Sequence, residues 1–228
     1  MVNQIVSGRK NIKDLAYESI KESIISGDLN PGEVLTEEFL AKSLGISRTP
    51  LREAVNILIR ENWIVKEKSR IKVAPLTKAE LTNLFLLRQY LEVLAAIQAV
   101  ENVTPEFLND LKEIMNKMER AEKLENTEEV VKLGSDFHAR IIEQADNPHL
   151  KEMVETILEK IKRYRHIGVN TVSTRSKSAV EEHFTILRAI ETQNSDLAEE
   201  AMKDHIKLSQ ESIKLSEKIE GNEDNEKI

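Results

Sequence analysis

Residues 44–63 read LGISRTPLREAVNILIRENW, and this stretch decides the fold of the N-terminal part of the chain. Ser47 can cap a helix with its hydroxyl, and Pro50 fits the first turn, where a missing N–H costs little. Apolar residues follow at helical spacing and make one face, namely Leu51, Ala54, Val55, Leu58 and Ile59. Asn62 tolerates the left-handed backbone that commonly ends a helix. The stretch therefore predicts the turn and second helix of a helix-turn-helix.

The polar side of this helix carries chemistry suited to DNA. Arg48, Thr49 and Arg52 lie with Ser47 toward its N-terminal end, and Asn56 follows one turn later. Guanidinium, hydroxyl and amide groups in this position suit the phosphates and base edges of a major groove. A small helical hairpin without a DNA role would show a similar apolar pattern, so the flanking sequence has to decide between the two.

The flanking sequence predicts the remaining parts of a winged helix-turn-helix. Residues 36–44 supply the supporting helix, and Gly45 makes the turn. Residues 64–67 and 71–73 are predicted strands, and the basic segment 68–70 joins them into a wing. This wing favours the DNA-binding interpretation.

The segment PGEVLTEEFLAKSLGISRTPLREAVNILIRENWIV, residues 31–65, resembles the winged helix-turn-helix of GntR-type transcriptional repressors. The usual run in that family is close to LSRTPVREAL. The resemblance implies that four residues contact DNA, namely Ser47, Arg48, Thr49 and Arg52. Arg70 in the basic wing completes the predicted DNA-binding set.

Two positions depart from the family pattern. Glu38 stands where the family often has an arginine in the supporting helix, which removes one phosphate contact. Ser69-Arg70 replaces the frequent Arg-Gly of the wing, which changes how the wing tip meets the minor groove.

The composition bounds the class of protein. The chain has 228 residues, of which only 7 are Gly and 5 are Pro, and this favours helix over sheet. It has no cysteine, which excludes disulfides, thiolate metal sites and a cysteine nucleophile. The sequence contains no run of about 18 apolar residues, so no membrane span is expected. The first residues lack the apolar core of a signal peptide. We therefore expect a cytoplasmic protein with no membrane partner.

The net charge of −7 is distributed unevenly. Residues 1–76 contain 12 Lys and Arg against 10 Asp and Glu, whereas the remainder contains 21 against 30. A weakly basic part attached to an acidic body can bind DNA, because local phosphate contacts count rather than the total charge. A homodimer would double these contacts.

The fold class is predicted to be mainly α, with a winged helix-turn-helix followed by an all-α antiparallel bundle of about six helices. A first helix is expected over 11–26, with Leu15, Ala16, Ile20, Ile24 and Ile25 facing inward. The bundle helices are expected at 78–101, 104–123, 127–145, 148–167, 176–193 and 196–217. Their starts are marked by Thr77 with Glu80, Thr104 with Pro105, Asn126 with Glu129, Pro148, and Asp196 with Glu199.

These elements predict four parts of the chain. Residues 1–75 form the DNA-binding domain, and residues 76–80 are a linker and the start of a helix. Residues 81–217 form an all-α domain for effector binding and dimerisation. Residues 218–228 are a charged tail that we expect to be disordered.

Three of the five histidines lie on the apolar faces of their own predicted helices, namely His138, His183 and His205. An inward histidine is most often a hydrogen-bonded core residue. Three of them on separate helices of one bundle also suit a divalent transition metal, because neutral imidazoles are common metal ligands. Spacing alone leaves both interpretations open.

A family resemblance extends into this second part. Three segments are similar to the C-terminal FCD domain of the FadR-type branch, namely FHARIIEQADNPHL (137–150), EEHFTILRAIE (181–191) and AEEAMKDHI (198–206). In many members, three histidines and an aspartate hold a metal at the bottom of an effector cavity. The resemblance implies that His138, His183 and His205 are metal ligands, with zinc, nickel or manganese as candidate metals.

The aspartate of the family has no counterpart here. It stands four residues before the first histidine, on the same helix face, and this chain has Gly134 at that position. Asp136 is only two residues before His138 and should point roughly the other way. The metal would then have three protein ligands and open positions, bind weakly, or be absent.

Arg88 is a further inward polar group, since it lies on the apolar face of its predicted helix. Glu92 is four residues later, so one interpretation is an internal ion pair. The other is a bidentate clamp for the carboxylate of an effector. The family has arginine here in a similar RxxLE pattern, which favours the clamp. Periodicity does not decide whether residues 163–165 also reach the cavity.

Together these features predict a DNA-binding transcriptional regulator, a repressor that binds operator DNA as a homodimer. A small organic acid would bind in the bundle through a metal and Arg88. The same regulator with a metal-free ligand cavity is an alternative. A metal-dependent helical-bundle enzyme is a further one, since three histidines with an open position can activate water. No obvious base accompanies the histidines, so we expect no enzymatic activity.

Overall fold

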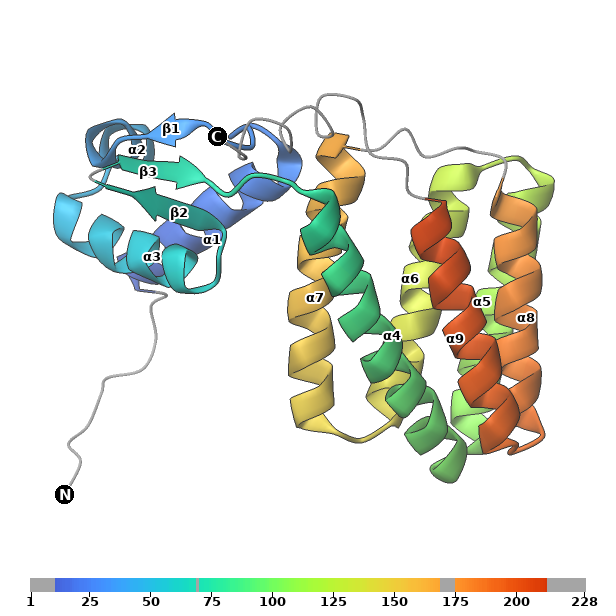
Figure 1. The fold of residues 1–228 in the computed structure, drawn as a ribbon. Coiled ribbons are helices and arrows are strands. Elements are labelled where there is room, and N and C mark those ends of the chain that lie inside the picture. The colour runs from blue at the N-terminus through green and yellow to red at the C-terminus, as the bar shows by residue number, and fades with distance from the viewer. Residues whose placement is uncertain (1–10, 69, 169–174, 213–228) are drawn as a thin grey trace, which may run out of the picture. The chain divides into compact units, whose positions relative to one another are not determined.

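The computed structural model describes residues 11–68, 70–168 and 175–212 (Figure 1). The chain divides into two compact units, with the boundary between Leu76 and Thr77. The segment expected to be a charged tail lies outside the described residues. In the part of the chain that the structure describes, no helix is both long and apolar enough to cross a bilayer.

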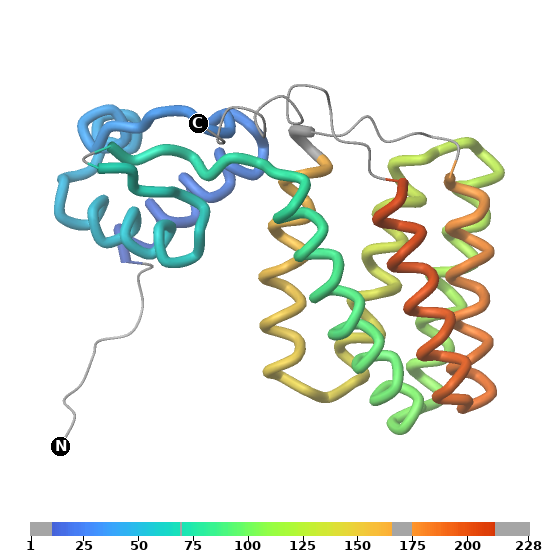
Figure 2. Tube along the Cα trace, viewed as in Figure 1, coloured from blue at the N-terminus to red at the C-terminus, as the bar shows by residue number. Residues whose placement is uncertain are grey.

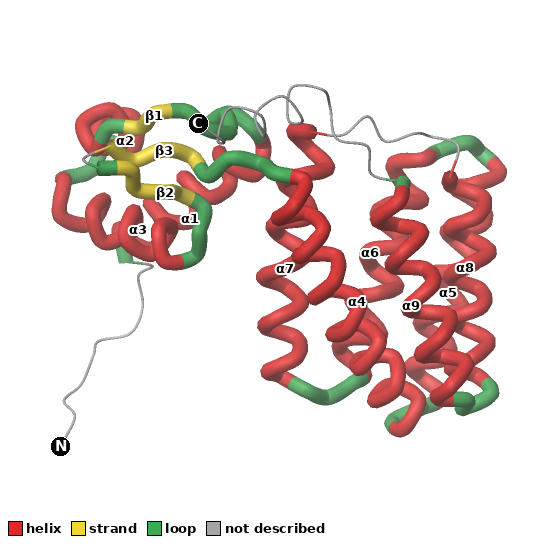
Figure 3. Tube along the Cα trace, in the orientation of Figure 1, coloured by secondary structure: helices red, strands yellow, loops and turns green. Residues whose placement is uncertain are grey.

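The first unit combines three helices with a small sheet, coloured by type in Figure 3. Its elements in chain order are α1 (Ile12–Ser26), β1 (Val34–Leu35), α2 (Glu37–Leu44), α3 (Arg48–Arg60), β2 (Ile64–Glu67) and β3 (Arg70–Val73). The sheet is antiparallel with the order β1-β3-β2. The predicted helices and both wing strands are present. The two-residue strand β1 was not predicted, because so short a run has no readable alternation.

A single apolar core holds these elements together. The apolar face of α3 supplies Leu51 and Leu58, both fully buried, and Trp63 packs into the same cluster. Burial of such side chains stabilises the unit by roughly 1.5–3 kcal/mol each. Asn62 has a φ of 59°, as predicted for the residue that ends this helix.

Two details of the first unit differ from expectation. Leu15 is 51% exposed, because the buried positions of α1 follow Ala16 at intervals of four and Leu15 lies about 100° away from that line. Ser47 occupies the N-cap of α3 with extended backbone, but its side chain makes no capping hydrogen bond. The predicted hydroxyl cap of this helix is therefore wrong.

The described part of the second unit is a bundle of six helices, seen as tubes in Figure 2. They are α4 (Lys78–Glu101), α5 (Pro105–Lys123), α6 (Thr127–Gln144), α7 (Pro148–Gly168), α8 (Ser176–Glu191) and α9 (Ser195–Glu211). Helix α4 packs against α6, α7, α8 and α9, so its buried face meets most of the bundle. The mainly α fold class is confirmed.

Helix caps explain most of these boundaries. Thr77, Thr104 and Asn126 each accept a hydrogen bond from a backbone N–H three residues later, as the sequence predicts. The last helix begins one residue earlier than expected, because Asn194 caps it and not Asp196.

Candidate functional site

The N-terminal end of α3 presents polar side chains to solvent. Ser47, Arg48, Thr49 and Arg52 are all exposed, while the opposite side of the helix is buried in the core. One of the two arginines already has a partner, since Arg52 Nε lies 2.7 Å from Glu37 Oε2 on α2. This ion pair is largely solvent-exposed and therefore weak, so an incoming phosphate can replace the carboxylate.

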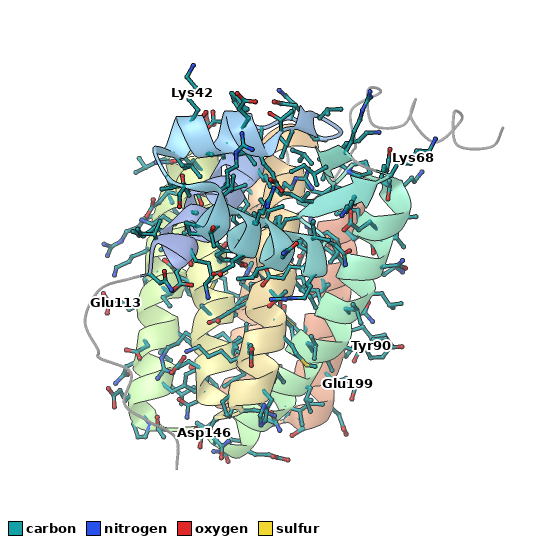
Figure 4. All side chains as sticks on the ribbon, turned by 90° about the vertical axis from the view of Figure 1, so that its left-hand side faces the viewer. Lys42, Lys68, Tyr90, Glu113, Asp146 and Glu199 are labelled. Atoms are coloured by element: carbon teal, nitrogen blue, oxygen red, sulfur yellow. The ribbon has the colours of Figure 1, made fainter. Side chains whose placement is uncertain are left out.

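The wing adds further positive charge to this unit. Arg70 and Lys68 are exposed at the end of the β2–β3 hairpin, and Figure 4 shows Lys68 extending outward. Lys68 has a φ of 55°, which turns the chain sharply between the strands. Ser69, the other residue of the predicted tip, lies outside the described residues.

The second unit brings together three histidines from three helices. His138 on α6, His183 on α8 and His205 on α9 are buried, with 4–5% of their surfaces exposed. A set of ligand nitrogens, one from each ring, lies within 4.8 Å of one another. Two of them, His138 Nε2 and His205 Nε2, are 3.0 Å apart. The sequence-predicted residues therefore form one cluster.

Two of the imidazoles, His183 and His205, have a hydrogen-bond acceptor at Nδ1, and Nδ1 of His138 lies beside a carboxylate oxygen without hydrogen-bond geometry. His138 Nδ1 lies 2.5 Å from Glu92 Oε2, and His205 Nδ1 lies 2.8 Å from Glu182 Oε2. His183 Nδ1 donates to the backbone carbonyl of Ala179 at 2.6 Å. A carbonyl or carboxylate at Nδ1 selects the tautomer whose Nε2 carries a lone pair. For His183 and His205 the arrangement thus favours a lone pair on Nε2, and the Nε2 atoms of all three rings face one another.

The electrostatics favour the neutral form of two of the three imidazoles, those of His183 and His205. Burial lowers the pKa of His183 well below its ordinary value, and the other two histidines lower it further. Burial likewise lowers the pKa of His205, with His138 and Arg88 adding to the effect. Two neutral rings with Nε2 lone pairs 3.0 Å apart repel each other unless a cation or proton lies between them. His183 Nε2 is also buried without a hydrogen-bond partner, so the donor set fits a metal ion.

Gly134 leaves space beside these rings. It lies on α6 one turn before His138, and a Cβ atom built on it would be 3.5 Å from Cε1 and Nε2 of His183. Asp136 is exposed and is not part of the cluster, as its spacing predicts. A fourth protein ligand of the family type is therefore missing among the described residues of this site.

Arg88 and Glu92 form a buried ion pair on α4, with Arg88 Nε 2.5 Å from Glu92 Oε1. Burial raises the pKa of Glu92, but Arg88 and His138 more than offset this, so the carboxyl stays ionised. Arg88 Nη1 is buried without a hydrogen-bond partner, which leaves one side of the guanidinium available. The internal ion pair is thus present, and the remaining donor still permits the clamp.

A cavity of about 560 Å³ opens onto the cluster, a volume suited to a small metabolite. Its wall includes Gly134, the three histidines and Arg88, together with two arginines that spacing had not assigned, Arg165 and Arg175. Glu182 was missed as well, although it directly precedes His183. Nothing in sequence spacing shows that it reaches the histidine of another helix.

Comparisons with known proteins agree with this division of the chain. The family model described as "Bacterial regulatory proteins, gntR family" matches residues 12–71, and the FCD domain model matches residues 83–208. The uncharacterized regulator YdhC of Bacillus subtilis is 27% identical over 87% of this chain and 89% of its own. The Escherichia coli regulator McbR is 28% identical over 78% and 81%.

Solved structures show the same fold. Escherichia coli McbR/YncC has a TM-score of 0.67 at 24% identity, covering 88% of this chain and 96% of its own. A transcriptional regulator from Rhodococcus sp. RHA1 has a TM-score of 0.64 at 18% identity, covering 87% and 95%.

Proposed function

Because the chain belongs to the GntR family of bacterial regulatory proteins and its second unit is an FCD domain, it is a transcriptional regulator, and we propose that it is a metabolite-responsive repressor. Its first unit binds operator DNA in the cytoplasm. Its second unit binds a small organic acid. The observation that carries the effector part is the convergence of three imidazoles on one cavity.

The exposed end of α3 supports the DNA-binding part of the proposal. Ser47, Arg48, Thr49 and Arg52 enter the major groove, and Arg70 contacts DNA from the wing. The packed apolar face of α3 keeps the helix rigid while these side chains are free to reach the duplex.

Alanine substitutions test this surface. Arg48→Ala and Arg52→Ala should each weaken operator binding by about 1–3 kcal/mol if the side chain reads a base. Arg60→Ala is the matched control, because Arg60 is exposed at the other end of the same helix and should leave affinity unchanged. Fluorescence anisotropy with an operator duplex at fixed, moderate salt measures the effect. Undiminished binding after both changes rejects the assignment.

In the second unit, His138, His183 and His205 hold a divalent transition metal, with zinc, nickel or manganese as the candidates. A metal held there would act as a Lewis acid toward an oxygen of the effector. Ala179 and Glu182 orient two of the rings through their Nδ1 atoms, a role that commonly changes metal affinity about 10–100-fold.

Elemental analysis of protein purified without chelator tests the metal site. We expect about one metal per chain, or a thermal shift on adding zinc, nickel or manganese, and loss of both in His183→Ala. His149→Ala, an exposed histidine of α7, serves as control. Absence of bound metal together with absence of any thermal shift removes the metal from the proposal and leaves a metal-free cavity.

An apolar stripe on α4 supports the homodimer part of the proposal. Four large side chains on its outer side are exposed, namely Leu86, Leu87, Tyr90 and Leu94. Figure 4 shows Tyr90 pointing away from the bundle. Contiguous exposed apolar surface commonly marks an interface, and two-fold symmetry matches a palindromic operator. The acid regulates binding by favouring one arrangement of the two DNA-binding units over the other.

A further inference from the structure

Three guanidinium groups from different elements line the effector cavity. Arg88 comes from α4, Arg165 from the end of α7, and Arg175 from the residue that precedes α8. Three buried or half-buried cations would be unfavourable in the wall of a cavity for a neutral ligand, because each cation loses hydration energy there.

Two of the three arginines have a carboxylate partner. Arg88 is paired with Glu92, and Arg175 Nη2 lies 2.6 Å from Glu182 Oε2. No hydrogen bond or ion pair joins Arg165 to another residue in the described ranges 11–68, 70–168 and 175–212. Arg165 is therefore the one of these three arginines without a carboxylate partner among the described residues, while Arg88 keeps a single unpaired nitrogen, Nη1.

The charges around Arg165 do not balance. Three guanidiniums face two carboxylates, which leaves one positive charge before a metal is counted, and a divalent metal on neutral histidines brings the excess to three. Burial lowers the pKa of Arg165 to about 10, and repulsion from Arg88 and Arg175 contributes despite the attraction of Glu92. The site therefore gains free energy from an added anion.

Other charged groups of the wall do not supply this anion. Glu155, Glu159 and Lys162 also line the cavity, on the same helix as Arg165. Glu155 and Lys162 are exposed, so water and salt screen their charges. At a rise of about 1.5 Å per residue, Glu159 starts roughly 9 Å and Glu155 roughly 15 Å away along the helix.

We propose that the ligand of this cavity is a small dianion, and that Arg165 binds its second negative charge. This inference rests on the proposed function and narrows its effector class. One acidic group meets the histidine cluster with its metal, and the other meets the open guanidinium of Arg165. A monocarboxylate leaves two of the three excess positive charges uncompensated in a partly buried site. Hydroxyl-bearing residues in the wall accommodate a polar molecule, namely Thr127, Ser135, Ser176, Ser209 and Ser212.

Matched pairs of acids test the proposal on the metal-loaded full chain. Succinate is compared with butyrate and glutarate with pentanoate, each pair being equal in carbon number, by calorimetry and thermal shift at constant ionic strength. Glycerol 3-phosphate represents phosphate esters, so that a dicarboxylate and a phosphate dianion can be told apart. We expect the dianion of at least one pair, or the phosphate ester, to bind at least about tenfold more tightly than the monoanions, a typical value for one added charge-assisted contact.

Two variants assign this preference to its residue. Arg165→Gln should abolish the preference for dianions, whereas Lys162→Gln, which removes an exposed cation of the same helix, should keep it. Equal binding of mono- and dianions, no binding of any dianion, or an undiminished preference in Arg165→Gln overturns the inference. Metal content and operator binding are measured on the same preparations. Their loss would count against the proposed function, whereas their retention without discrimination counts against the dianion alone.

Discussion

Gly134 lies one helical turn before His138 and offers the histidine cluster no side chain. Its φ is not in the left-handed region, so the backbone does not require glycine there. The nearest atoms to an added Cβ are in the ring of His183 at ordinary contact distance. The position can therefore accept a side chain. The cluster is open on this side because residue 134 is glycine, and not because the backbone or its neighbours require it.

Gly134→Asp should strengthen metal binding by about tenfold or more, because it adds a carboxylate beside His183 Nε2 where the family has one. Competition with a chromogenic chelator measures the affinity. Gly134→Ala is the control. It should leave metal affinity unchanged and stabilise α6 by up to about 1 kcal/mol through helix propensity. Equal metal affinity in the aspartate variant would contradict this account of the site.

The residues of this site differ in how well sequence could find them. The three histidines were found because each lies on the apolar face of its own helix, and helical period shows which side a residue occupies. The carboxylates beside their Nδ1 atoms, those of Glu92 and Glu182, were not, because such contacts form between different helices. Ser47 shows a related limit, since a suitable cap residue was present but its hydroxyl made no bond.

At the scale of elements, Tyr164 joins the end of α7 to the start of α4. Its hydroxyl accepts a hydrogen bond from the backbone N–H of Thr77 at 3.0 Å. Two acceptors lie within its reach, Glu80 Oε2 at 2.6 Å and the carbonyl of Thr77 at 3.0 Å. Burial and Glu80 raise the pKa of this phenol, so it remains a neutral donor at physiological pH. Sequence periodicity left the role of this tyrosine undecided.

Tyr164→Phe should lower the free energy of unfolding of the second unit by about 1 kcal/mol, because the half-buried N–H of Thr77 loses its hydrogen-bond partner. Urea denaturation followed by circular dichroism measures the loss. Tyr90→Phe removes the same hydroxyl from a residue that is 67% exposed, so it should change nothing. Equal stability of the two variants would show that the Tyr164 contact contributes no net free energy.

Helices were the most predictable elements of the chain. Their apolar period and their cap residues are local, so the bounds of α4 and α5 were expected within a residue. Strand β1 was missed because it is defined by its pairing with β3, which is not local in sequence. Leu15 was assigned inward because an apolar residue beside a buried line looks the same in sequence as one within it.

For the whole molecule, the proposed dimer depends on the outer side of α4. Leu87 and Tyr90 are 52% and 67% exposed, and with Leu86 and Leu94 they form an exposed apolar patch of the kind that commonly marks an interface. Two copies of such a stripe can cover each other through a two-fold axis, since the same surface serves both partners.

A Leu87→Glu/Tyr90→Glu variant should be a monomer at concentrations where the wild type is a dimer, because four charges would meet in an apolar interface. Analytical ultracentrifugation reports the mass. Affinity for a palindromic operator should fall with it, as only one half-site is then bound at a time. Leu124→Glu is the control, since Leu124 is more exposed still and lies on α5's C-cap, away from α4 in sequence. If the double variant is still a dimer, the dimer interface lies on another surface.

The neighbouring residues Tyr164 and Arg165 make different contacts. Arg165 belongs to the wall of the cavity, while the hydroxyl of Tyr164 holds the first residue after the boundary between the two units. Consecutive residues of an α-helix point in directions about 100° apart. A ligand bound by Arg165 therefore lies one residue along the helix from the hydroxyl that hydrogen-bonds to Thr77.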